Sequence, residues 1–105
     1  MNTRNLLMTA VALTMLSAGP VFAAGDAAAG KTKSVVCAAC HGPTGVSSNP
    51  QWPKLACQHA AYLVLSMKAY RDGQRKHAVM SPMAKPLSDK DIDNLAAYFS
   101  SQPCK

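Results

Sequence analysis

The stretch that decides the fold reads Cys37-Ala38-Ala39-Cys40-His41. Two cysteines three positions apart on a helix lie on one face and present both thiols to a single cofactor, and the imidazole that follows can bind iron from one side. This C-x-x-C-H pattern is the signature of covalent haem attachment through two thioethers. We therefore expect Cys37 and Cys40 to bind one haem and His41 to be an axial ligand of its iron.

Two other kinds of site also use paired cysteines. A structural zinc site needs four ligands, commonly from two such pairs, whereas the remaining cysteines, Cys57 and Cys104, are far apart in the sequence. A thioredoxin-like redox dithiol needs a preceding strand and a βαβ context, which this sequence lacks. Both alternatives fit the residues less well than haem does.

The first residues have the layout of a secretory signal peptide. Arg4 supplies a positive charge, residues 6–16 form a short apolar run, and Val21-Phe22-Ala23 resembles a cleavage site. The apolar run is far shorter than the roughly 20 residues of a spanning helix, so an uncleaved membrane anchor is the weaker interpretation. We expect cleavage of residues 1–23, which leaves one domain at 24–105 whose marginal core needs a disulfide, metal or cofactor.

Three helices are expected in that domain, and no stretch alternates like a strand. The first runs from Ala27 to about Val36 behind the N-cap Asp26. The second covers residues 58–72 and is followed by the stop signal Gly73.

The third helix covers residues 89–101 behind Ser88, which begins a capping-box pattern. Residues 42–55 and 74–87 contain several turn formers and are expected to be loops, because proline interrupts long helices. A loop this long in a small domain is typical of a chain that wraps something. The sequence therefore predicts an all-α fold, three main helices with long loops around one haem. The third helix has one apolar stripe, made of Ile92, Leu95, Ala96, Tyr98 and Phe99.

The second axial ligand decides between electron transfer and the binding of small molecules. A methionine thioether opposite the histidine is typical of electron-transfer haems. Met67 falls within the second helix and is expected in the core, whereas Met80 and Met83 lie in the second loop. His59 and His77 are weaker candidates, since a single histidine is more often a hydrogen-bonded surface residue. The residues alone do not choose between Met80 and Met83.

At this point the chain resembles a family, the class I cytochromes c, and especially a single domain of the cytochrome c4 group with its short monohaem relatives. The resemblance covers essentially all of residues 24–105. It rests on the order of several short pieces: Cys37-Ala38-Ala39-Cys40-His41-Gly42, Pro53-Lys54-Leu55-Ala56, Gln58, Tyr62-Leu63, Gly73, Arg75, Met80-Ser81-Pro82-Met83-Ala84, Leu87-Ser88-Asp89-Lys90-Asp91-Ile92 and Leu95-Ala96-Ala97-Tyr98-Phe99.

The resemblance implies one haem c, with thioethers at Cys37 and Cys40 and with His41 and Met80 as axial ligands of the iron. Met80 is preferred to Met83 because it falls where the family's ligand lies relative to the start of the last helix.

The resemblance also implies two packing features. Gly30 is expected at a close helix crossing near Tyr98, and Pro53 with Trp52 is expected at the haem edge. We expect the side chains that cover the haem to be those of Trp52, Leu55, Tyr62, Leu65 and Leu95.

One position departs from the family pattern. The family usually has glycine where this chain has Cys57, and it often ends without a counterpart of Cys104. Two extra cysteines in an oxidising compartment suggest a disulfide between the second helix and the C-terminal tail. Free thiols and an intermolecular bridge are the alternatives.

Charge and composition bear on the partners. The 11 basic residues outnumber the 5 acidic ones, for a formal net charge of +6 at pH 7. Export makes nucleic acid an improbable partner, so scattered lysines are expected either to be solvated or to guide docking with acidic redox proteins. The prediction is a monomeric periplasmic electron carrier that is not an enzyme and has no stable membrane anchor. Family expectation suggests a bc1-type donor and a terminal oxidase as acceptor.

Two rival functions follow from the same residues. A haem with an open sixth position would be a gas-binding or peroxidatic protein. A haem subunit of a larger periplasmic redox complex is the other rival, and it would purify together with a catalytic subunit.

Overall fold

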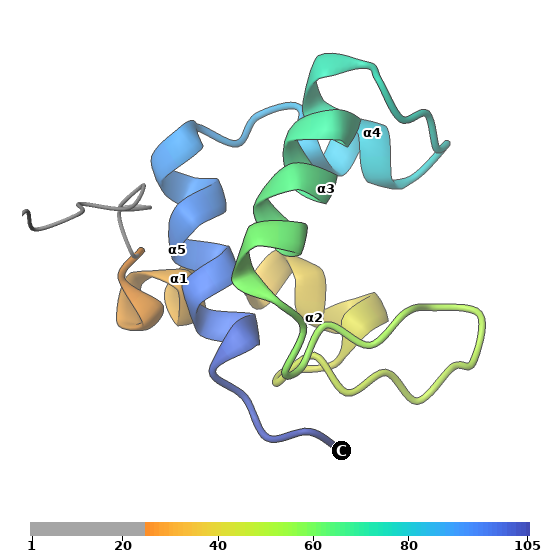
Figure 1. Cartoon of the computed structure of the whole chain (residues 1–105). Coiled ribbons are helices and arrows are strands. Elements are labelled where there is room, and N and C mark those ends of the chain that lie inside the picture. The colour runs from red at the N-terminus through yellow and green to blue at the C-terminus, as the bar shows by residue number, and fades with distance from the viewer. Residues whose placement is uncertain (1–24) are drawn as a thin grey trace, which may run out of the picture.

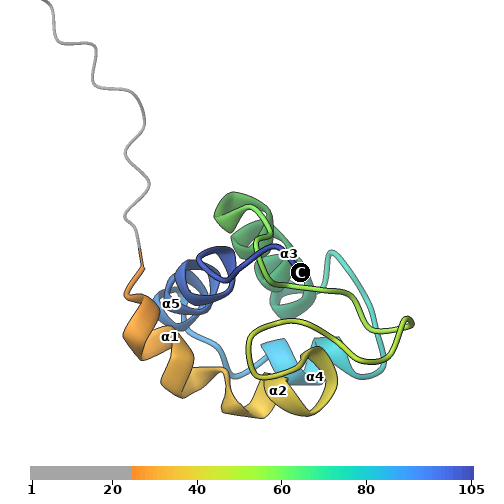
Figure 2. The same ribbon diagram turned by 90° about the horizontal axis from the view of Figure 1, so that it is seen from below.

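All the regular secondary structure in the part of the chain that the structure describes is helical. The computed structural model describes residues 25–105. In Figures 1 and 2, α5 lies between α1 and α3 and contacts both. The predicted all-α class is confirmed, and the predicted signal peptide lies outside the described residues. The helices in chain order are α1 (Ala27–Lys33), α2 (Val35–His41), α3 (Ala60–Asp72), α4 (Met80–Ala84) and α5 (Asp89–Ser100).

The first predicted helix is wrong at its C-terminal end, because the chain breaks it at Ser34. The hydroxyl of Ser34 donates to the carbonyl oxygen of Lys31 at 2.8 Å, and Ser34 itself is buried. A serine hydroxyl that bonds to a carbonyl three residues earlier competes with the helical ladder and bends it. The break separates α1 from α2 and gives the segment that carries the cysteine motif its own helix.

The core is centred on α5. Ser88 caps this helix by accepting a hydrogen bond from the Asp91 N–H at 3.0 Å, and the Asp91 carboxylate accepts one from the Ser88 N–H at 3.0 Å. This reciprocal arrangement is the predicted capping box. The predicted apolar stripe is confirmed, since every member is buried: Ile92, Leu95, Ala96, Tyr98 and Phe99.

The crossing of α1 and α5 depends on a glycine. A Cβ on Gly30 would meet the Asn94 carbonyl oxygen and would lie 2.9 Å from the Tyr98 Cβ. Only a residue without a side chain allows two backbones to approach so closely. The predicted contact between Gly30 and the region of Tyr98 is therefore present.

One of the two predicted loops is confirmed and the other contains a short helix. Residues 42–55 contain no helix, as expected, whereas residues 74–87 contain the short helix α4. Pro82 is the third residue of α4, where no intrahelical partner is available for an N–H, so proline is tolerated there. α3 begins at Ala60, two residues later than expected, and ends at Asp72 before Gly73.

Candidate functional site

Helix α2 carries the complete C-x-x-C-H motif. Cys37 and Cys40 are both half-buried and unpaired, and Cys37 packs against the cluster formed by α3 and α5. Burial raises the pKa of the Cys37 thiol. The motif therefore lies beside the core.

His41 is the last residue of α2, and its imidazole is only 7% exposed. Nδ1 of His41 lies 2.8 Å from the carbonyl oxygen of Pro53. A carbonyl oxygen only accepts hydrogen bonds, so Nδ1 carries the proton and donates it. The lone pair of Nε2 is left for another partner, which is the arrangement typical of a metal-binding histidine.

The loop that supplies the Pro53 carbonyl is itself held in place. Gly45 has a φ of +83°, and its carbonyl oxygen accepts from the N–H groups of Leu55 and Ala56 at 2.8 and 3.1 Å. The Tyr98 hydroxyl donates to the carbonyl oxygen of Pro43 at 2.7 Å. The Gly45 bonds hold the two ends of the loop together, and the Tyr98 bond ties its first end to α5. Backbone carbonyls have no sequence pattern, so the partner of His41 was not predictable from residue types.

The methionines and the other histidines lie in different places. Met67 is partly buried against the core, as expected, and Met80 is the half-buried first residue of α4. Met83 is 39% exposed. His59 and His77 are both exposed, before α3 and α4 respectively.

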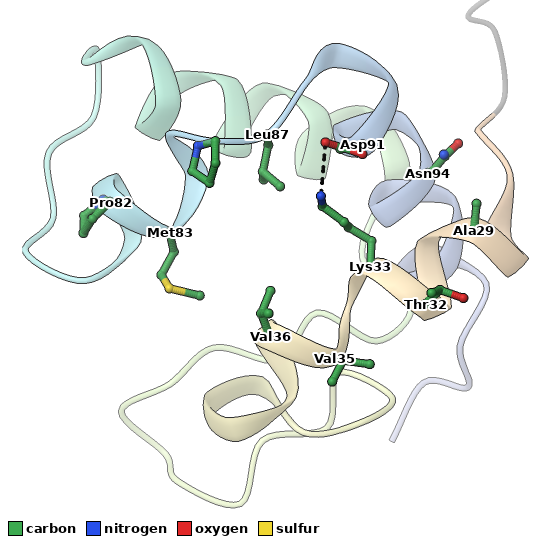
Figure 3. Close-up of a pocket in the computed structure, with 11 residues that line it drawn as sticks. Ala29, Thr32, Lys33, Val35, Val36, Pro82, Met83, Leu87, Asp91 and Asn94 are labelled. Atoms are coloured by element: carbon green, nitrogen blue, oxygen red, sulfur yellow. Dashed lines mark ion pairs between the residues drawn. The ribbon is translucent and has the colours of Figure 1, made fainter.

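An open pocket of about 580 Å³ lies beside the motif. Figure 3 shows Met83 of α4 and Val36 of α2 facing each other across it, with the ion pair between Lys33 and Asp91 at one side. Neither His41 nor Met80 lines it, but Val36 is the neighbour of Cys37 in the chain. The apolar part of the lining comes from Val35, Val36, Pro82, Met83, Pro86 and Leu87.

The side chains expected to cover the haem are not all buried. Leu95 is in the core and Leu55 packs against it, but Trp52, Tyr62 and Leu65 are exposed. On α3 the residues that face the core are Leu63, Val64 and Met67, and helical geometry puts positions 62 and 65 on the opposite side. Trp52, Tyr62 and Leu65 are therefore not covered by the protein's own core, and their role in covering the haem stays a prediction.

Some of the basic side chains are paired with acidic ones. Lys33 lies 3.5 Å from Asp91, and Lys68 lies 3.8 Å from Asp89. Arg71 binds the carboxylates of Asp72 and Asp89, at 2.8 and 2.7 Å. Its hydrogen bonds lower the pKa of both carboxyl groups. These ion pairs neutralise part of the positive charge of the basic side chains within the fold.

Cys57 and Cys104 form a disulfide, with their Cα atoms 5.0 Å apart. Cys57 has a φ of +63°, in the left-handed region that favours glycine, and its N–H donates to the Phe99 carbonyl oxygen at 3.0 Å. The disulfide therefore joins the segment before α3 to the tail that follows α5.

Two other features of the described residues bear on the site. No group of three or more His, Cys, Asp or Glu side chains in residues 25–105 is arranged to hold a metal ion. Within the same range, none of the helices has the length and apolar character needed to cross a membrane.

Comparisons with known proteins agree with this site. The model of the cytochrome c family matches residues 27–103. Cytochrome c-554(548) of Halomonas halodenitrificans is 57% identical over 82 residues, which are 75% of this chain and 99% of that protein. Cytochrome c4 of Pseudomonas aeruginosa is 46% identical over 98 residues, which are 93% of this chain and 49% of that protein.

A solved structure is also similar. Reduced recombinant cytochrome c4 from Pseudomonas stutzeri has a TM-score of 0.73 and 45% identity, covering 76% of this chain and 47% of that one. The chain therefore spans about half the length of the cytochrome c4 relatives it matches.

A helical domain with C-x-x-C-H at the end of a helix and a histidine with a free Nε2 defines a protein with covalently bound haem. The chain belongs to the cytochrome c family. It is an electron-transfer protein of the cytochrome c4 type with one haem c, as the sequence predicted.

Proposed function

We propose that the chain carries single electrons in the periplasm through a haem whose iron is bound by His41 and Met80. The observation that carries this proposal is the hydrogen bond from Nδ1 of His41 to Pro53 at 2.8 Å. It sets the tautomer and the orientation of the ring, and of the two ring nitrogens of His41 it leaves Nε2 free to bind the iron. The haem c of the family supplies an iron that changes between the ferrous and ferric states.

Cys37 and Cys40 are proposed as the two thioether attachments. Their three-residue spacing on α2 puts both sulfur atoms on one side of the helix, and the pattern is that of covalent attachment. Attachment next to His41 fixes the histidine relative to the haem without further contacts.

Met80 is the proposed second ligand, and Met83 is the alternative. Both belong to α4, but Met83 is directed into the open pocket, whereas Met80 is half-buried at the start of the helix. A thioether ligand favours the reduced state and raises the reduction potential. A sixth ligand that stays bound in both oxidation states suits an electron carrier better than a catalyst, because it leaves no open position for a substrate.

A pair of methionine variants tests this ligation. Met80→Ala is expected to lose the near-infrared charge-transfer band between sulfur and iron, and Met83→Ala is expected to keep it. The opposite result assigns the ligand to Met83. If both variants keep the band, methionine ligation at this helix is contradicted.

The cellular role is part of the same proposal. Residues 1–23 are proposed to be a cleaved signal peptide, and sequencing of the purified protein should then begin at Ala24. The partners are proposed to be redox proteins with acidic surfaces, such as a bc1-type donor and a terminal oxidase, met by the monomer in brief encounters.

The rival functions have separate signatures. If the sixth position is open, the reduced protein binds carbon monoxide rapidly, as a gas-binding or peroxidatic protein does. If the chain is a subunit of a larger redox complex, it elutes from a gel-filtration column together with a catalytic subunit rather than as a monomer.

A further inference from the structure

The exposed side chain of His77 is bonded to the start of the helix that carries Met80. Nδ1 of His77 accepts hydrogen bonds from the N–H groups of Val79 and Met80, at 3.1 and 3.2 Å. Because Nδ1 accepts, the proton of the ring is on Nε2. The histidine therefore holds the backbone of the proposed iron ligand directly.

The main chain of His77 completes the same connection. Its N–H donates to the Ser81 hydroxyl at 2.9 Å, and its carbonyl oxygen accepts from the Ser81 N–H at 3.1 Å. The bonds from Val79, Met80 and Ser81 therefore converge on one residue.

The ring of His77 is in turn placed by α3. It packs edge-on against the Tyr70 ring, with 6.4 Å between the ring centroids and 75° between the planes. Arg75 lies over the Tyr70 ring, with its guanidinium carbon 4.6 Å from the ring centroid. Arg75 also donates to the Ser66 hydroxyl at 3.1 Å. His77 therefore connects α3 to α4, because its ring packs on Tyr70 of α3 and bonds to the start of α4.

Helix α4 depends on such outside help. It has five residues, far fewer than an isolated helix needs, and its N-cap residue Val79 makes no side-chain cap. The third residue, Pro82, has no N–H. All three N–H groups that precede it, those of Val79, Met80 and Ser81, have their acceptor in His77.

We propose that His77 is a positioning residue that fixes the backbone of Met80 and thereby keeps the Met80 sulfur on the iron. This inference rests on the proposed ligation by Met80. It assigns His77 no bond to iron and no role in accepting electrons. Its contribution is to slow the loss of the sulfur ligand. An electron carrier needs this, because it must keep both iron ligands in each oxidation state.

Three variants test the proposal in the haem-loaded protein. His77→Ala removes the acceptor, and His77→Asn keeps one, because the Oδ1 of asparagine lies as many bonds from the backbone as Nδ1 of histidine. His59→Ala is the matched control, since His59 is also exposed but makes no side-chain bond at α3. The measurements are the rate at which added imidazole displaces the sulfur ligand, followed by the charge-transfer band, and amide hydrogen exchange at Met80.

His77→Ala removes the acceptor of two hydrogen bonds, so both rates should rise by at least about threefold to tenfold, the range that corresponds to one lost hydrogen bond. His77→Asn should return them close to the original values, and His59→Ala should leave them unchanged. Equal rates in His77→Ala and the original protein overturn the proposal. So does a His77→Asn variant that melts normally but exchanges its ligand as fast as His77→Ala.

The failure of the proposed function is distinguishable from the failure of this inference. If Met80→Ala keeps the charge-transfer band, the ligand assignment is wrong and the inference falls with it. If Met80→Ala loses the band while His77→Ala behaves like the original protein, the ligation stands and only the positioning role is wrong.

Discussion

The backbone N–H of Asp26 donates to the side-chain oxygen of Asn94 at 2.8 Å, so the N-cap residue of α1 is bonded to the middle of α5. Asp26 also caps α1, because its carboxylate accepts from the N–H groups of Ala28 and Ala29. Asn94 is buried, with 8% of its surface exposed. One amide side chain thus sets where α1 starts relative to the helix it crosses.

Asn94→Ala should destabilise the protein by about 1–3 kcal/mol, because the Asp26 N–H loses its partner in a partly buried place. Thermal unfolding followed by circular dichroism measures the change. Asn94→Asp keeps an acceptor of the same shape and should lose less. Equal losses in the two variants would show that the hydrogen bond is not what holds the helices together.

Gly30→Ala should also destabilise the protein, although alanine is the better helix former by about 1 kcal/mol. The new Cβ would meet the Asn94 carbonyl oxygen and Tyr98, so the two helices must move apart. Ala28→Gly, at an exposed site on the same helix, is the control and should lose only the propensity difference. An unfolding midpoint for Gly30→Ala at or above the original value contradicts a close crossing.

Removing the disulfide should lower stability without altering the haem site. Cys57 and Cys104 are 47 positions apart, and closing a loop of that size stabilises by about 4 kcal/mol in the chain-entropy model. We expect the double variant Cys57→Ser/Cys104→Ser to melt at a lower temperature with an unchanged visible spectrum. A changed charge-transfer band would mean that the disulfide also positions the iron ligands.

The capping box should make stability depend on pH in acid. The hydrogen bond from the Ser88 N–H lowers the pKa of Asp91, and the hydrogen bond from Arg71 lowers that of Asp89. A carboxyl group whose pKa is lower in the folded state stabilises above its unfolded pKa of about 3.9, and this contribution is lost as the pH falls through the folded value.

Asp91→Asn should therefore be less stable than the original protein at pH 7 and should approach it in stability near pH 2. Unfolding midpoints measured across that interval provide the test. A constant difference at every pH would mean that the charge of Asp91 contributes nothing.

The features that follow from local chemistry were predictable from the sequence. Asp26 and Ser88 mark their helix starts by side-chain capping, the α5 stripe follows the helical period, and C-x-x-C-H identifies the cofactor. The break at Ser34 was not predictable, because serine is tolerated within helices and its residue type does not show that its hydroxyl bonds to Lys31. The exposure of Tyr62 and Leu65 depends on which side of α3 meets α5, which is a tertiary fact. The acceptor role of His77 depends on backbone N–H groups that every residue except proline carries.

Ligation of the haem iron by His41 and Met80 is tested most directly by the optical spectrum of the purified protein, oxidised and reduced, with carbon monoxide added to the reduced form. An electron carrier with His41 and Met80 as iron ligands should show a c-type alpha band, a low-spin haem with a sulfur–iron charge-transfer band, and no rapid binding of carbon monoxide. A high-spin spectrum with rapid carbon monoxide binding would show an open sixth position and contradict a His41 and Met80 electron carrier.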